Sequence, residues 1–159
     1  MTVAASIVVV THRGIGETVW ACLASLASAS DVEGAPLVRT IVVDNGGGPI
    51  TPAGDYGPGV DDVICVENRG FGAAANAGIR LARRTSAAPI ALLNDDVEVD
   101  EGWLSVLLGA LADNDRVGAV QPMLLRHGTD LINSVGVNLD RFAAGSDRGI
   151  GVSVGMAGA

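Results

Sequence analysis

The sequence contains no lysine, and all ten of its basic residues are arginines, against eighteen acidic residues. The net charge is therefore -8. Proteins that bind nucleic acid need a basic face, so a chain this acidic is a poor candidate for that class. A small phosphate-bearing ligand is still compatible with the charge, because a bound metal ion or a helix N-terminus can supply a positive field.

Cysteines and long apolar runs are also scarce. Cys22 and Cys65 both fall inside apolar patterns, which favours two buried small side chains over a metal cluster. No stretch approaches the ~20 apolar residues of a membrane helix, and the first residues lack the basic start of a secretory signal. We therefore expect a cytoplasmic protein, which is compatible with peripheral association at the inner face of a membrane.

Apolar runs of strand type alternate with apolar stripes of helix type along the 159 residues. This alternation predicts an α/β fold with a mostly parallel sheet and flanking helices. Strands are expected at 6–10, 40–43, 62–66, 90–93 and 117–120, helices at 17–29, 73–84 and 101–112, and a strand-like segment at 131–139. We expect a core domain at 1–122 and a truncated or poorly ordered region at 123–159.

The most informative stretch is 89–99, where four apolar residues run into two adjacent acids, Asp95 and Asp96. Residues 90–93 are expected to form a strand that is buried on both faces. Adjacent carboxylates at the end of such a strand repel each other and are costly to desolvate. A divalent cation such as Mg²⁺ or Mn²⁺ would relieve both effects, which predicts a metal site. The alternative is a solvated turn.

Polar residues follow four of the predicted strands. In a parallel sheet these strand ends share one edge, which is where open α/β sheets bind ligands. Asp44 could accept a hydrogen bond from a nucleoside base or ribose there, or it could simply form a turn. The four polar signatures are Thr11-His12-Arg13, Asp44-Asn45, Glu67-Asn68 and Asn94-Asp95-Asp96.

The segment after the first strand partly matches a dinucleotide-binding fingerprint. Gly14 and Gly16 would be its first two glycines, and Asp44 the acid after the second strand. Val19 replaces the third glycine, and the paired acids at 95–96 have no role in nicotinamide binding. An NAD-dependent oxidoreductase is therefore a less favoured alternative.

Four segments, taken in order and at their spacing, resemble the family-2 glycosyltransferases, which have the GT-A fold. The resemblance runs over about 6–122, and its third segment is especially similar to rhamnosyltransferase-type members that build bacterial surface polysaccharides. The segments are 7–11, 41–45, 67–79 and 92–97.

The resemblance implies transfer of a sugar from a nucleotide-diphosphate sugar to a hydroxyl of a glycan or lipid-linked acceptor, with inversion. It implies that Asp96 binds Mn²⁺ or Mg²⁺ and that Asp95 faces the ribose or a metal-bound water. Asn94 replaces the first acid of the family's D-x-D motif. Together with His12 and Arg13 from the ligand edge, the residues expected to bind the donor are Thr11, His12, Arg13, Asp44, Asn68, Gly70, Asn76 and Asp95.

An inverting transferase needs a general base to deprotonate the acceptor. In the family that base follows the metal motif, and no matching motif follows Asp147. The chain therefore resembles the donor-binding half of such an enzyme, with the catalytic base unknown. A non-catalytic nucleotide-sugar-binding fragment and a nucleotidyltransferase are the alternatives.

Overall fold

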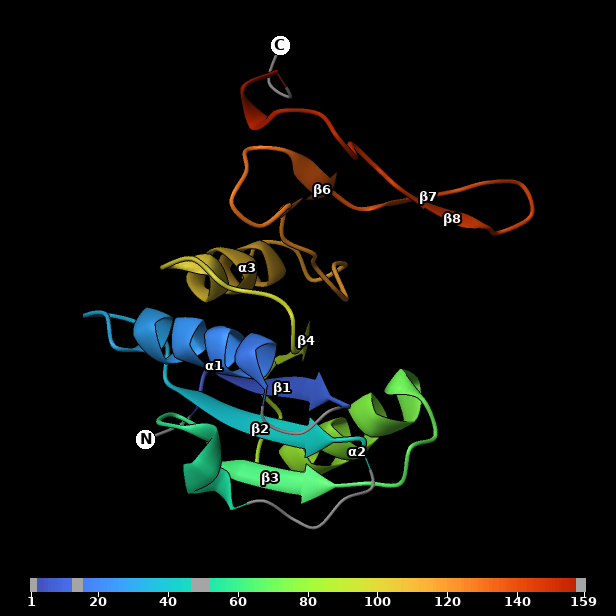
Figure 1. The fold of residues 1–159 in the computed structure, drawn as a ribbon. Coiled ribbons are helices and arrows are strands. Elements are labelled where there is room, and N and C mark those ends of the chain that lie inside the picture. Colours follow the sequence, from blue (N-terminus) through green and yellow to red (C-terminus); the bar gives the residue numbers. More distant parts are fainter. Residues whose placement is uncertain (1–2, 13–15, 47–51, 157–159) are drawn as a thin grey trace. The chain divides into compact units, whose positions relative to one another are not determined.

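The computed structural model describes residues 3–12, 16–46 and 52–156. The chain divides into two compact units, Met1–Ser105 and Val106–Ala159, which are described separately. None of the described helices is long and apolar enough to cross a membrane. The first unit contains β1 (Ala5–Thr11), α1 (Glu17–Ser30), β2 (Val38–Asp44), the 3₁₀ helix η1 (Ala53–Tyr56), β3 (Asp62–Cys65), α2 (Phe71–Arg83), β4 (Ile90–Asn94) and the start of α3 (Trp103–Ala112) (Figure 1).

The strands of the first unit form one four-stranded parallel sheet in the order β3-β2-β1-β4. Successive residues of a strand point to opposite faces, so Ile7 and Val9 of β1 enter one core cluster while Val8 and Val10 enter another. Helix α1 covers the first face and α2 covers the second (Figure 1). The predicted α/β class with a mostly parallel sheet and flanking helices is confirmed.

Helix α1 buries the stripe that its sequence predicts. Val19, Cys22, Leu23 and Leu26 are all buried, and they pack in the same core cluster as Val42 of β2. Their spacing of three and four residues places them on one side of the helix. The position of α1 on the sheet therefore follows from the local pattern alone.

Helix α2 lies very close to the sheet through its smallest residues. A Cβ atom at Gly78 would lie only 2.4 Å from Cγ1 of Val8, so no larger residue fits at this position. Ala82 is buried with Gly78, whereas the larger Leu81 is only half-buried. A leucine cannot enter so narrow a contact, and Leu81 packs at its side instead.

Strand β4 is not buried on both faces, so that expectation is wrong. Leu93 is 8% exposed and packs in the core under α1, but Leu92 is 46% exposed. Among the described residues β4 pairs only with β1 and forms the edge of the sheet. Leu92 shares its face with α2, which packs mainly over β1 and β2 and leaves the edge strand partly uncovered.

Two expectations near α3 also differ from the structure. The helix begins at Trp103, two residues later than predicted, because Gly102 has a φ of +76° that a helix cannot continue through. Residues 117–120 form no strand. Asn114 turns the chain there, since its carbonyl accepts a hydrogen bond from the amide of Val117 at 2.9 Å and its side chain accepts one from Arg116.

The second unit contains the rest of α3, followed by short antiparallel strand pairs. The strand-like segment predicted at 131–139 is split where Gly136 takes a φ of +122°. Ile132 and Ser134 are the buried residues among those described in this unit. Its strands are β5 (Leu124–Leu125) with β6 (Ile132–Ser134), and β7 (Val137–Leu139) with β8 (Gly145–Asp147), followed by the 3₁₀ helix η2 (Val154–Met156).

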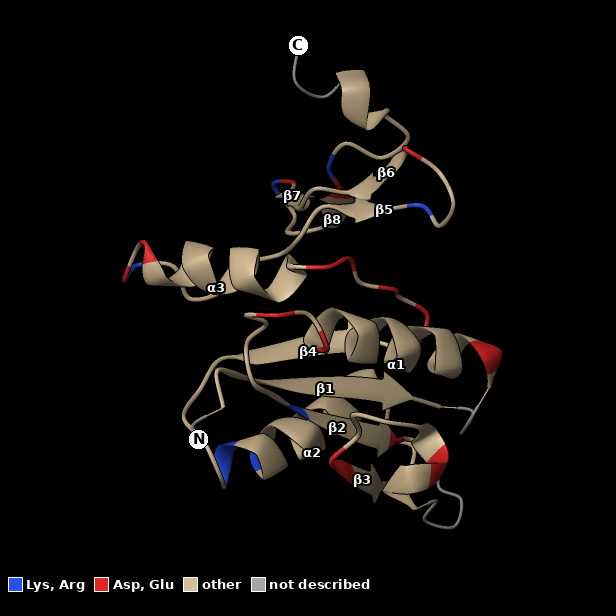
Figure 2. Cartoon of the chain, turned by 90° about the vertical axis from the view of Figure 1, so that its left-hand side faces the viewer, with Lys and Arg blue, Asp and Glu red and all other residues tan. Residues whose placement is uncertain are grey.

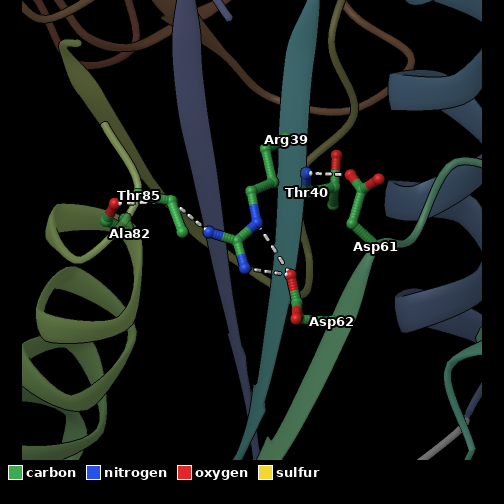
Figure 3. Close-up of polar contacts among 6 residues, drawn as sticks. All are labelled: Arg39, Thr40, Asp61, Asp62, Ala82 and Thr85. Carbon is green, nitrogen blue, oxygen red and sulfur yellow. Dashed lines mark hydrogen bonds and ion pairs between the residues drawn. The ribbon is translucent and has the colours of Figure 1, made fainter. Parts of the chain in front are cut away.

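A polar network ties the N-terminal ends of β2 and β3 to the end of α2 (Figure 3). The guanidinium of Arg39 forms an ion pair with Asp62, with 2.7 Å between Nη2 and Oδ2, and it also donates to the hydroxyl of Thr85. The amide of Thr40 donates to Oδ2 of Asp61 at 2.8 Å. Polar groups of strand ends and a helix end are thus paired with one another at this end of the sheet.

Candidate functional site

The C-terminal ends of the strands meet along one edge of the sheet. The register places Thr11 of β1 opposite Asp44 of β2, and Val10 opposite Asn94 of β4. Cys65 at the end of β3 lies opposite Asp44 on the other side. The arrowheads of β1, β2 and β3 in Figure 1 point to this edge. The structure therefore brings the polar strand ends together, as the sequence predicts.

Asp44 is held in place at this edge and is only 6% exposed. Its Oδ1 accepts a hydrogen bond from the amide of Gly46 at 2.8 Å, and its Oδ2 accepts one from the hydroxyl of Tyr56 at 3.4 Å. A Cβ atom at Gly46 would lie 2.8 Å from the carbonyl oxygen of His12, so the turn requires glycine there. Asp44 thus forms the turn that the sequence offers as one alternative, and its carboxylate is also a buried hydrogen-bond acceptor.

Asn45 follows Asp44 and is equally buried, at 5% exposure. Its amide donates to the carbonyl of Thr11 at 2.8 Å, and its side-chain Nδ2 donates to Oδ1 of Asn68 at 3.3 Å. Its Oδ1 is buried and has no hydrogen-bond partner among the described residues. A buried acceptor without a partner costs about 1–3 kcal/mol, and such atoms are rare in folded proteins.

Asn68 links the loop after β3 to the start of α2. Its Oδ1 also accepts a hydrogen bond from the amide of Gly70 at 3.1 Å, and Gly70 is the N-cap residue of α2 with a φ of +89°. Nδ1 of His12 lies 3.4 Å from both Nδ2 of Asn68 and the carbonyl oxygen of Asn45. The first contact needs an unprotonated Nδ1 and the second a protonated one, so His12 makes one of them at a time.

The other residues expected to bind the donor are placed as follows. Thr11 is buried at the end of β1, with 1% exposure. Asn76 is exposed on α2, and no hydrogen bond joins it to Asp44, Asn45 or Asn68. Arg13 lies outside the described residues.

Asp95 and Asp96 occupy the turn directly after β4, where Asp95 is half-buried and Asp96 is exposed. Neither forms an ion pair or a side-chain hydrogen bond with another described residue. Their charge reaches Cys22 on α1. Burial, together with the nearby carboxylates of Asp95 and Asp96, raises the pKa of Cys22 to about 11. No described basic side chain pairs with these two carboxylates, so the electrostatic potential at this turn is negative.

The donor atoms at this turn fit a hard divalent cation. The described part of the chain holds no group of three or more His, Cys, Asp or Glu residues that could enclose a metal ion. Mg²⁺ and Mn²⁺ need no such cage, because they bind one or two carboxylates and keep positions open for water and phosphate oxygens. Asp95 and Asp96 match this incomplete ligand set.

Two residues of this edge, Asn45 and Tyr56, have no role that the sequence predicts. Asn45 is part of the polar signature after the second strand, and only its long-range contact with Asn68 distinguishes it. Tyr56 lies in a Gly- and Pro-rich segment between the strands predicted at 40–43 and 62–66, where no helix or strand is predicted, yet it belongs to η1 and is fully buried. It is the one tyrosine of the chain, and an isolated aromatic residue in such a segment is a signal of an anchored loop.

Comparison with known proteins agrees with this geometry. S. aureus TarS 1-349 has a similar structure, with a TM-score of 0.51 and 15% sequence identity over 82% of this chain and 41% of that chain, a likeness that concerns the fold. This chain thus spans less than half the length of the TarS chain. No curated protein matches the chain. The family model described as glycosyl transferase family 2 matches residues 6–134. Because that match covers most of the sequence, the chain belongs to glycosyltransferase family 2, with the α/β architecture of the GT-A fold.

Proposed function

We propose that this chain is the donor-binding part of an inverting glycosyltransferase that acts in the synthesis of a bacterial surface polysaccharide. Residues 1–122 would bind a nucleotide-diphosphate sugar, and the acceptor side would begin in 123–159. One observation carries this proposal. The buried acceptor Asp44 and the adjacent carboxylates of Asp95 and Asp96 lie on the same edge of one parallel sheet. Such an edge suits a ligand with a nucleoside at one end and a diphosphate at the other.

In this proposal Asp44 receives the nucleoside. An ionised carboxylate can only accept hydrogen bonds, so the group it binds must present an N–H or O–H. Thr11 lies opposite it in the register, and Asn68 reaches the same edge through Asn45. The remaining residues assigned to the donor are His12, Arg13, Gly70 and Asn76.

At the other end of the ligand, Asp96 would hold Mn²⁺ or Mg²⁺, and Asp95 would contact the ribose or a metal-bound water. When bound, the cation neutralises charge on the diphosphate leaving group. Without a cation, the paired negative charges at 95–96 would repel a diphosphate. We therefore expect donor binding to depend on the metal.

Sugar transfer also needs a general base near the acceptor hydroxyl, and we assign that role to no residue of this chain. The acceptor would be a glycan or a lipid-linked acceptor, presented at the cytoplasmic face of a membrane. Binding of the nucleotide sugar without transfer is the second candidate function. No base motif of the family is found after Asp147, and this favours the second candidate for the isolated chain.

Calorimetric titration with UDP, dTDP and GDP, each with and without Mn²⁺, tests the proposal. One of these nucleotides should bind only when the metal is present. Absence of binding across the panel would contradict the proposal. Binding of NAD without metal would instead favour an oxidoreductase. Release of sugar from a donor onto an acceptor by the isolated chain would rule out the second candidate.

A further inference from the structure

Tyr56 connects the core of the first unit to the site edge. Its ring is fully buried in the core cluster that α1 forms with the sheet, together with Val9 and Val42. Its hydroxyl reaches Oδ2 of Asp44 at 3.4 Å. A buried tyrosine usually finds a partner for its hydroxyl, and here one partner is the side chain expected to bind the nucleoside.

The short helix that carries Tyr56 is anchored next to α1. Gly57 follows η1 with a φ of +98°, and a Cβ atom there would lie 2.8 Å from Cζ3 of Trp20. The backbone after η1 therefore lies directly on the indole ring of α1. With the buried ring of Tyr56, this gives η1 two contacts with the body of the unit, so the hydroxyl has a defined position.

With the hydroxyl of Tyr56, both carboxylate oxygens of Asp44 accept a hydrogen bond. The amide of Gly46 donates to Oδ1 and Tyr56 donates to Oδ2, so rotation of the carboxylate would cost both hydrogen bonds. Each carboxylate oxygen can accept more than one hydrogen bond. Asp44 thus keeps acceptor capacity for a ligand while its orientation is fixed.

We propose that Tyr56 is a positioning residue that orients Asp44 toward a hydrogen-bond donor on the nucleoside of the bound nucleotide. This inference rests on the proposed function, because it requires that Asp44 contacts the nucleoside. A pre-oriented acceptor loses less freedom on binding, which increases affinity. The effect of Tyr56 on affinity is therefore transmitted through Asp44 and concerns the nucleoside end of the ligand.

The main test compares Tyr56→Phe with the wild-type chain by titration with UDP, dTDP and GDP in the presence of Mn²⁺. The ring stays in the core, and loss of a hydrogen bond to a charged group should weaken nucleotide binding about tenfold. Pyrophosphate with Mn²⁺ should bind both chains equally, because it lacks the nucleoside. Asp55→Asn is the matched control, since Asp55 is an exposed neighbour in the same short helix.

A double-mutant cycle with Asp44→Asn separates positioning from a purely structural role. If Tyr56 acts through Asp44, Tyr56→Phe should change nucleotide affinity little in the Asp44→Asn background. An equal loss in both backgrounds, or wild-type affinity in Tyr56→Phe, would overturn the inference. Absence of nucleotide binding by the wild-type chain would instead overturn the proposed function and this inference with it.

The wild-type chain offers a second readout that needs no substitution. Because Tyr56 is the one tyrosine of the sequence, selective labelling of tyrosine gives a single set of ring signals. These signals should shift when the binding nucleotide is added with Mg²⁺, and they should stay unchanged with pyrophosphate and Mg²⁺. Unchanged signals on nucleotide binding would contradict the inference even if Tyr56→Phe failed to fold.

Discussion

Polar side chains at the two ends of the parallel sheet differ in whether they have hydrogen-bond or ion-pair partners. At the N-terminal end, Arg39 pairs with Asp62, and the carboxylate of Asp61 accepts a backbone amide (Figure 3). At the C-terminal end, Oδ1 of Asn45 lacks a hydrogen-bond partner among the described residues, and the carboxylates at 95–96 form no ion pair with any of those residues. At the N-terminal end the polar groups pair with one another within the chain. At the C-terminal end, hydrogen-bond acceptors stay available for a ligand.

The distribution of acids in the first unit supports this contrast. Figure 2 shows acidic segments at several strand and helix ends, so acidity alone does not mark a site. The N-terminal acids face a guanidinium or a backbone amide of the same chain. Asp95 and Asp96 instead form no ion pair or side-chain hydrogen bond with a described residue, and after burial they are the next causes of the raised pKa of the Cys22 thiol. Unpaired charge, more than the number of charges, distinguishes the two ends.

The largest effect is expected for a substitution at the C-terminal end of the sheet, where the unpaired carboxylates lie. Asp96→Ala should weaken metal-dependent nucleotide binding by at least about 100-fold, or ~2.7 kcal/mol, because it removes a carboxylate from the cation. Stability without metal should stay the same or rise slightly, since one of two repelling charges is lost. Calorimetry and thermal unfolding measure the two effects. Asp100→Asn, at an exposed acid in the following turn, is the matched control. Unfolding of the Asp96→Ala chain would show that Asp96 is structural.

A second prediction uses Cys22 to report on the same charges. Its pKa is raised from 9.0 to about 11 in the folded chain, so the unfolded thiol loses its proton first as the pH rises. The associated stability is fully present below pH 9 and is lost as the pH approaches 11. The free energy of unfolding should fall by about 2 kcal/mol over this window from this group alone.

Chemical denaturation at a series of pH values checks that loss. Cys22→Ala should lack this component of the alkaline decrease, whatever its stability at pH 7, while Cys65 is common to both chains. In the Asp96→Ala chain the decrease should be smaller, because one carboxylate that raises the pKa is gone. Identical alkaline profiles for the wild-type and Cys22→Ala chains would contradict the prediction.

The smallest effect is expected at the N-terminal end. Arg39→Met removes the ion pair with Asp62 and the contact with Thr85, and it should lower the free energy of unfolding by about 1 kcal/mol. Nucleotide affinity should not change, because this end lies opposite the site edge. Arg80→Met, at an exposed arginine of α2, should leave both quantities unchanged. Loss of nucleotide binding in Arg39→Met would contradict the prediction that only the C-terminal end of the sheet takes part in binding.

The parts of the fold that the sequence predicts well are those set by local periodicity. The stripe of α1 follows from the spacing of its apolar residues, and the strands around Val9 and Val42 follow from uninterrupted apolar runs. The exposure of Leu92 could not be predicted, because an apolar run does not show whether its strand lies in the centre or at the edge of a sheet. The start of α3 depends on the φ of Gly102, which a helical stripe does not reveal.

The candidate site shows the same limit. Asp44 directly follows one predicted strand, and Asp95 and Asp96 follow another after Asn94, so their meeting at one edge follows from the parallel topology. The hold of Tyr56 on Asp44 and the link from Asn45 to Asn68 join residues that lie 12 and 23 positions apart. Such contacts arise from how loops fold back onto the edge, and no local pattern encodes them.

The most direct test of the central claim is to map nucleotide binding on the backbone amides of the labelled chain by NMR, with Mg²⁺ and the nucleotide selected by calorimetry. We expect shifts at the C-terminal edge, at 44–46, 68–70 and 95–96. The N-terminal residues Arg39 and Asp62 should stay unshifted. Shifts centred on Arg39 and Asp62, with none at Asp44 or Asp96, would contradict the claim that the unpaired edge is the binding site.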